Sequence, residues 1–227
     1  MSNFFVFFVR FLPDLLRGAG MTLLLTAEGL AVGFVLGLLA TLARSYGGKF
    51  SRGLAVSYIE LFRGTPLLVQ LFLIYYGLPG IGLTLSREWS AFLALGLNSG
   101  AYQAEYLRGS ILAIGDGQMM AGRAIGMSKW KTVFNIILPQ ALRLAIPAWA
   151  NEPVSLLKST AVVFLIAVPE LMAKAKAIAA KTYDPIGSYI AVAIVYLAMV
   201  YLLDIFLKWV ERYTRIPGFE LEGKRPE

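Results

Sequence analysis

Apolar blocks long enough to cross a lipid bilayer dominate this chain. The first covers residues 21–43, and its only ionisable residue is Glu28. A membrane-spanning helix needs about 20 mostly apolar residues, because its backbone groups must all be paired internally. Further blocks of this kind cover residues 54–78, 89–114, 144–168 and 185–203. The sequence therefore predicts an all-α integral membrane protein with about five transmembrane helices.

Small residues recur along the first block at spacings of three and four. Residues at these spacings share one face of a helix, and small side chains let neighbouring helices approach closely inside a membrane. We expect this face to pack tightly against another helix; its members are Gly29, Gly33, Gly37 and Ala40.

The residue inventory excludes several kinds of site. Of the 227 residues, 58% are hydrophobic and 15% are charged, and there is no cysteine and no histidine. Disulfides, thiolate or imidazole metal sites and Ser-His or Cys-His nucleophile pairs are therefore excluded. The nucleotide-binding motif G-x-x-x-x-G-K-[ST] is also absent. We expect no catalytic residue, no metal and no cofactor in this chain.

Basic residues lie between the apolar blocks rather than in one patch, although the formal charge is +7. This distribution is typical of membrane-protein loops and not of nucleic-acid binding. Placing residues 44–52, 108–143 and the chain from 208 onward on one side gathers most of the basic residues there. By the positive-inside rule that side is cytoplasmic, and so is the C-terminus.

The two ends of the chain are expected to lie outside the bundle. Residues 1–20 are aromatic-rich and contain Arg10, Pro13 and Asp14, which favours an amphipathic segment at the membrane surface. The alternative is that they simply lead into the first span. The membrane domain then covers residues 21–212, and residues 213–227 form a cytoplasmic tail.

Two blocks contain residues that interrupt a plain membrane helix. In the second block, Pro66 cannot donate a hydrogen bond to the carbonyl of Phe62, which predicts a bend or break. Such breaks occur beside protein or water-filled cavities, so this block indicates a pathway, with a packing kink as the alternative. The fourth block is too polar to face lipid; it contains Pro147, Asn151, Glu152, Pro153 and Lys158.

Polar side chains at bilayer depth mark pathways or buried pairs, because they are costly there. Two pairs are spaced to share a helix face, Asn98 with Tyr102 and Glu152 with Ser155. We predict a midplane substrate site in which Glu152 meets an amino or guanidinium group; the candidates are Leu67, Gln70, Asn98, Tyr102, Glu152 and Ser155. The alternative is that Glu152 pairs with Lys158 or caps a break beside Pro153.

Charged and aromatic residues near the block ends have structural roles in this interpretation. Two acid-base pairs lie one turn apart, Glu60 with Arg63 and Glu105 with Arg108, and are expected to form ion pairs. Tryptophans near block ends are expected to anchor the chain at the membrane interface; these are Trp89, Trp149 and Trp209.

Residues 115–139 are too polar to cross a membrane and are patterned as two helices joined by a hinge. Asp116 is placed to cap a helix over residues 118–125, Gly126 to adopt the left-handed end, and Ser128 to cap the next helix. That second helix, residues 129–138, is expected to bury one apolar face; its members are Trp130, Val133, Phe134 and Ile137.

The hinge resembles the "EAA…G…I-x-L-P" loop of permeases from binding-protein-dependent ABC importers. Residues 120–126 read MAGRAIG and residues 136–139 read IILP. Three flanking segments resemble the polar amino-acid branch, the histidine, arginine and glutamine type: ELFRGTP at 60–66, AYQAEYLRG at 101–109 and LKST at 157–160. Two positions depart from the family pattern, with Met120 where Glu is usual and Gly122 where Ala is usual.

The resemblance implies a type I importer fold in a bacterial inner membrane. Two permease chains, identical or similar, would pair, with a cytosolic ATPase docked beneath each and an external amino-acid-binding protein delivering substrate. ATP and magnesium would bind the ATPase. The coupling helix would cover about residues 117–127 and transmit ATPase closure to the spans. The implied coupling residues are Gln118, Met120, Ala121, Gly122, Arg123, Gly126 and Pro139.

Three functions fit the sequence. The first is the permease subunit of an importer of polar, basic amino acids, working by alternating access. The second is an ion-coupled secondary transporter, which normally has more spans and an internal inverted repeat. The third is a membrane scaffold subunit, which gives no reason for a hinge between the third and fourth spans.

Overall fold

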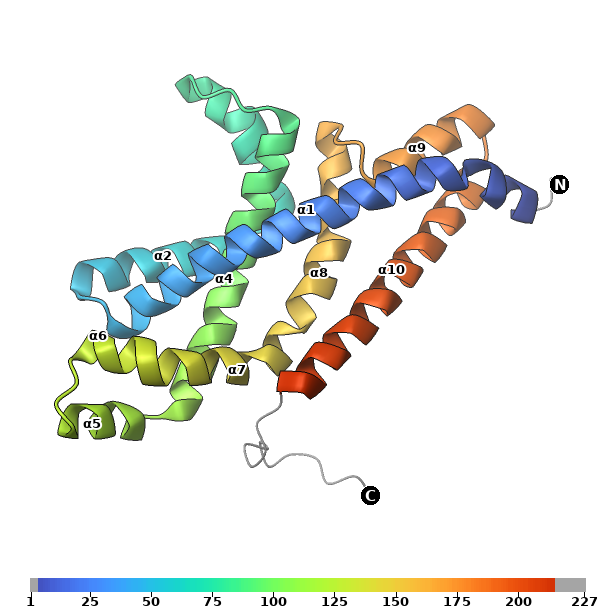
Figure 1. Ribbon diagram of the computed structural model, residues 1–227. Coiled ribbons are helices and arrows are strands. Elements are labelled where there is room, and N and C mark those ends of the chain that lie inside the picture. The colour runs from blue at the N-terminus through green and yellow to red at the C-terminus, as the bar shows by residue number, and fades with distance from the viewer. Residues whose placement is uncertain (1–3, 215–227) are drawn as a thin grey trace.

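The computed structural model describes residues 4–214, and the regular structure in this range is entirely helical (Figure 1). The α-helices are α1 (Phe4–Tyr46), α2 (Lys49–Gly64), α3 (Leu67–Phe72), α4 (Arg87–Ile114), α5 (Gly117–Ala124), α6 (Lys129–Thr132), α7 (Leu138–Trp149), α8 (Asn151–Ser159), α9 (Leu171–Thr182) and α10 (Pro185–Thr214). Short π-helices cover Leu73–Gly77 and Val133–Ile137, and 3₁₀-helices cover Leu78–Ile81 and Thr160–Ile166.

The predicted membrane crossings correspond to these elements. Within residues 4–214, α1 and α10 are long and apolar enough to span a membrane, and two bent helix pairs bring the total to four if each pair is one span. The remaining predicted block is α4. Its 28 residues extend about 42 Å, and it lies within the bundle, packed against α1, α2 and α7.

The glycine face of α1 packs directly on α4, as predicted. Gly29, Gly33 and Gly37 are buried. A methyl group added at Gly33 would lie 2.7 Å from Nε2 of Gln103 and 3.0 Å from the backbone nitrogen of Gly100. The two backbones therefore meet at a distance that only small residues allow.

The break predicted in the second block is present, and the fourth block is bent as well. The axis turns by 107° between α2 and the helical segment from Leu67 to Ile81, and by 54° between the segments Lys129–Trp149 and Asn151–Ile166. The helix that starts at Lys129 passes through Pro139 to Trp149, well beyond the predicted end at residue 138. The π-helix at Val133–Ile137 immediately precedes Pro139; proline lacks a donor, so a local change of hydrogen-bond register lets the helix continue.

The N-terminal segment is continuous with the helix of the first predicted span. α1 is one continuous helix from Phe4 and contains Pro13, so residues 4–20 extend the first span. This segment packs with α9 and α10 around Leu15, Leu171 and Ala191. A location at the membrane surface stays a prediction. Residues 215–227, most of the predicted tail, lie outside the described range.

Candidate functional site

Two amide side chains form hydrogen bonds at the break between α2 and α3. Pro66 leaves the carbonyl of Phe62 without its helical donor, and Nε2 of Gln70 takes that place at 2.8 Å. Nδ2 of Asn98, on α4, lies 3.2 Å from the same oxygen and 3.1 Å from Oε1 of Gln70. Two predicted site residues are therefore brought together, and their amides satisfy a backbone group that the proline has released.

Glu152 lies at the start of α8 and points at α4. It is only 4% exposed, and its carboxylate accepts hydrogen bonds from Ser99 at 2.7 Å and from Tyr106 at 3.5 Å. Within residues 4–214 it forms no ion pair, and Lys158 is exposed and makes no contact with it. The structure thus does not form the alternative pair of Glu152 with Lys158.

The other candidate substrate residues are distributed around this region. Leu67 packs at the edge of the core formed by α1, α4 and α8. The guanidinium carbon of Arg63 lies over the ring of Tyr102, 5.5 Å from the centroid of that ring. Ser155 is exposed, whereas Glu152, three residues earlier on α8, is buried. Glu152 and Ser155, predicted to share a face, therefore point to different surroundings.

A buried polar network beside Glu152 was not predicted. Gln103 on α4 donates to Ser99 at 3.0 Å and to the carbonyl of Leu30 on α1 at 3.1 Å, and it accepts from the indole of Trp149 at 2.8 Å. Trp149 therefore links α7 to this network, and its location at the membrane interface stays a prediction. The available signal was the spacing of Ser99, Gln103 and Tyr106, which places these three polar residues on one face of α4.

A cluster of three arginines surrounds Glu105. Its carboxylate lies 2.6 Å from Arg44 of α1, 2.7 Å from Arg108 of α4 and 3.8 Å from Arg63 of α2. The predicted pair of Glu105 and Arg108 is confirmed. The predicted pair of Glu60 and Arg63 is wrong, because Arg63 turns to Glu105 instead. One carboxylate thus links three helices.

The hinge forms largely as predicted. α5 covers Gly117–Ala124, Gly126 has a φ of +82°, and the hydroxyl of Ser128 accepts a hydrogen bond from the backbone nitrogen of Lys131 at 3.3 Å. Asp116 precedes α5 but makes no side-chain cap, since its backbone is in the right-handed helical region. A capping side chain normally requires an extended backbone at this position.

The hinge exposes two large apolar side chains. Met120 is 66% exposed and Ile125 is 77% exposed. Gln118, Ala121, Arg123 and Pro139 are exposed as well, whereas Gly122 is buried against Thr132. Of the predicted apolar face of the following helix, Val133 and Ile137 are buried, but Trp130 and Phe134 stack on each other and stay about half exposed.

A bundle of membrane-length helices, interrupted twice and carrying an exposed helical hinge, defines a membrane permease. The chain belongs to the family described as "Binding-protein-dependent transport system inner membrane component", whose model matches residues 33–216. It is therefore a permease subunit of an ABC importer, in the polar amino-acid branch, and its family is one of transport proteins and not of enzymes. Neither a secondary transporter nor a scaffold is favoured.

Several characterised relatives match over most of their length. The glutamine transport system permease protein GlnP of Escherichia coli (strain K12) is 39% identical over 207 residues, covering 90% of this chain and 94% of the relative. The L-cystine transport system permease protein TcyB of Bacillus subtilis (strain 168) is 41% identical over 203 residues, covering 89% of this chain and 87% of the relative. The arginine transport system permease protein ArtQ of the same strain is 35% identical over 202 residues, covering 88% and 92%.

Solved structures share the fold. A chain of the "Crystal structure of an amino acid ABC transporter with histidines" superposes with a TM-score of 0.86 at 36% identity, covering 94% of this chain and 99% of that one. A chain of the inward-facing MetNI methionine ABC transporter superposes with a TM-score of 0.74 at 22% identity, covering 91% and 99%. The second likeness concerns the fold alone.

Proposed function

We propose that this chain moves polar amino acids, basic ones among them, into the cytoplasm by alternating access driven by a separate ATPase. The relatives are named for glutamine, cystine and arginine transport, which supports an amino acid as substrate. The single observation that favours a basic substrate is Glu152, a buried carboxylate that two hydroxyl groups stabilise without a cationic partner in residues 4–214. A carboxylate in such surroundings attracts a cation.

The substrate would pass the break between α2 and α3. Gln70 and Asn98 hold this break on one side, and Glu152 with Ser99 lies further along α4. In this proposal Leu67, Gln70, Asn98, Tyr102, Glu152 and Ser155 line or support the pathway. Broken helices are common beside transporter substrate sites, because they combine exposed backbone groups with a cavity.

Coupling to ATP hydrolysis would occur at α5. The exposed Met120 and Ile125 offer apolar area to a cleft in the ATPase, and methionine adapts its shape to irregular clefts. The residues taking part would be Gln118, Met120, Ala121, Gly122, Arg123, Gly126 and Pro139. ATP and magnesium would bind the ATPase, and α5 and the C-terminus would lie in the cytoplasm. A second permease chain and an external binding protein would complete the importer.

Uptake by purified components tests this function. This chain, its ATPase and the external binding protein are reconstituted in vesicles, and accumulation of a panel of amino acids is measured with and without ATP. We expect accumulation of basic and neutral polar amino acids only with ATP. Accumulation without ATP, driven by an ion gradient, would overturn the mechanism.

A further inference from the structure

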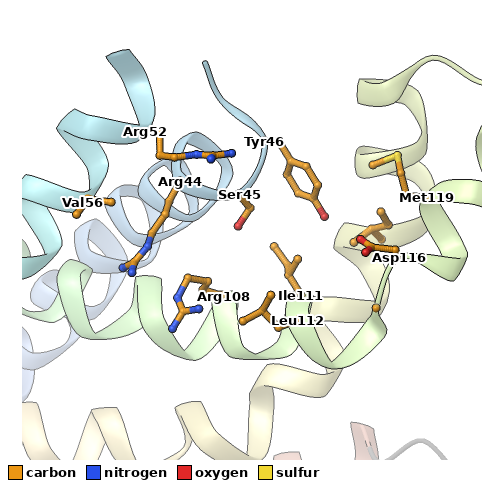
Figure 2. Close-up of a pocket in the computed structure, with 12 residues that line it drawn as sticks. Arg44, Ser45, Tyr46, Arg52, Val56, Arg108, Ile111, Leu112, Asp116 and Met119 are labelled. Carbon is orange, nitrogen blue, oxygen red and sulfur yellow. The ribbon is translucent and has the colours of Figure 1, made fainter. Parts of the chain in front are cut away.

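A cavity of about 420 Å³ lies between the end of the helix bundle and the hinge. Its walls come from the end of α1, the start of α2, the end of α4 and the start of α5, together with Ile137. Figure 2 shows Arg44, Arg52 and Arg108 on one side and Asp116 and Met119 of the hinge on the other. Any occupant would therefore contact both the bundle and the segment that carries α5.

Positive charge dominates the walls. The lining contains three guanidinium groups and one carboxylate, that of Asp116. Arg44 and Arg108 each bond Glu105, but Arg108 uses only Nε and Nη2 for this, so its Nη1 has no acceptor in residues 4–214. The side chain of Arg52 forms no ion pair or hydrogen bond within that range and extends toward Ser45 and Tyr46. Free guanidinium donors in one cavity suit a phosphate group, which they can bind in pairs.

Part of the cavity wall is apolar. On α2, Val56 lies one helical turn from Arg52 and lines the cavity, and Leu112 of the cavity wall is 64% exposed. A free phosphate ion would use none of this area. A phospholipid would use both parts, with its phosphate among the arginines and its acyl chains along the apolar side chains. Basic pockets between membrane helices on the cytoplasmic side bind lipid head groups in this way.

We propose that this cavity binds the phosphate group of an anionic phospholipid, and that the bound lipid fixes the position of the hinge relative to the bundle. The proposal rests on the proposed function in one respect, the cytoplasmic location of the hinge. Arg52 is the binding residue that can be changed with least effect on the fold, because Arg44 and Arg108 also hold Glu105. The cavity would thereby make transport sensitive to the composition of the inner leaflet.

Lipid retention measures the site without transport. The intact complex of this chain with its ATPase is incubated with mixed phosphatidylcholine and phosphatidylglycerol, and retained lipids are counted by native mass spectrometry. We expect preferential retention of phosphatidylglycerol, weakened about tenfold by Arg52→Gln, since this variant removes a charge-assisted hydrogen bond to the phosphate. The matched control is Arg212→Gln, which removes one exposed charge from the end of α10 and is expected to change nothing.

The outcomes separate the possibilities. Equal retention of phosphatidylglycerol by the unmodified chain, Arg52→Gln and Arg212→Gln would overturn the site. So would an equal loss of retention in the two variants. Displacement of phosphatidylglycerol by millimolar inorganic phosphate would overturn the lipid as its ligand. A thermal unfolding curve for each variant checks that the chain is folded. The proposed function fails separately, if ATP drives no amino-acid uptake in vesicles of either lipid composition.

Discussion

The carboxylate of Glu152 on α8 accepts a 2.7 Å hydrogen bond from the hydroxyl of Ser99 on α4, and no cation lies beside it within residues 4–214. Glu152→Gln keeps an oxygen that can accept this bond but removes the charge. We expect the apparent affinity for arginine to fall about tenfold or more, the usual value of a hydrogen bond to a charged group, while glutamine uptake keeps its affinity. Initial uptake rates over a range of concentrations for each amino acid measure this.

The control for that measurement is Glu88→Gln. Glu88 lies exposed near the start of α4 and bonds its neighbour Arg87 at 2.7 Å, so it is far along the helix from Ser99. Its loss should leave both affinities unchanged. Unaltered arginine affinity in Glu152→Gln would show that the buried carboxylate serves the fold and not the substrate.

Close contact of α1 with α4 predicts opposite effects for two glycine substitutions in one helix. The added methyl of Gly33→Ala would press on Gln103 and Gly100, and overpacking of this kind costs about 1–3 kcal/mol. Gly20→Ala meets nothing within 4 Å and should stabilise α1 by about 0.5–1 kcal/mol, because glycine loses more conformational freedom in a helix. Unfolding of both variants in detergent is followed by circular dichroism. A similar change of the free energy of unfolding in Gly33→Ala and Gly20→Ala would contradict the packing argument.

Helical periodicity and proline chemistry predicted much of this fold. The glycine face of α1, the break at Pro66 and the left-handed Gly126 each follow from local rules, and each is present. These features depend on neighbours a few residues away, so the sequence contains what determines them.

The features that the sequence did not predict depend on contacts between distant segments. Arg63 lies one turn from Glu60, yet it turns to Glu105, which already attracts Arg44 and Arg108. Trp149 lies at a block end, yet its indole meets Gln103 on another helix. In both cases the partner is a polar side chain on another helix, which local spacing does not reveal. The proposed pathway residues are subject to the same limit, since their roles depend on how helices meet.

The released carbonyl of Phe62 predicts that Gln70 is needed for stability. Gln70 is buried and donates to this oxygen at 2.8 Å and to that of Thr65 at 3.0 Å. Gln70→Leu would leave the Phe62 oxygen with only the longer bond from Asn98, at a cost of about 1–3 kcal/mol. Gln140→Leu is the matched control, because Gln140 bonds the Ile136 carbonyl within one continuous helix. Thermal unfolding measures both; equal midpoints would mean that the break needs no side-chain support.

The contact between Gly122 and Thr132 predicts that the position of α5 affects the coupling of ATP hydrolysis to transport. A methyl group at Gly122 would meet the Cγ2 and Oγ1 atoms of Thr132 at 2.5 and 2.7 Å, so Gly122→Ala should push α5 away from the helix that starts at Lys129. We expect fewer amino acids transported per ATP hydrolysed. Adding Thr132→Ala removes the obstructing atoms and should restore the number of amino acids transported per ATP. Residues in contact in this way typically show coupling energies of about 0.5–3 kcal/mol in a double-mutant cycle.

Gly117→Ala is the control within the same helix. Gly117 begins α5, and a methyl group there meets nothing within 4 Å, so the transport ratio should not change. Transport and ATP hydrolysis are measured together in vesicles for the four proteins of the Gly122 and Thr132 cycle and for this control. If the double variant is as impaired as Gly122→Ala alone, steric contact with Thr132 is not the cause. A loss shared by Gly117→Ala would instead implicate backbone flexibility of α5, because only that property changes at both glycines.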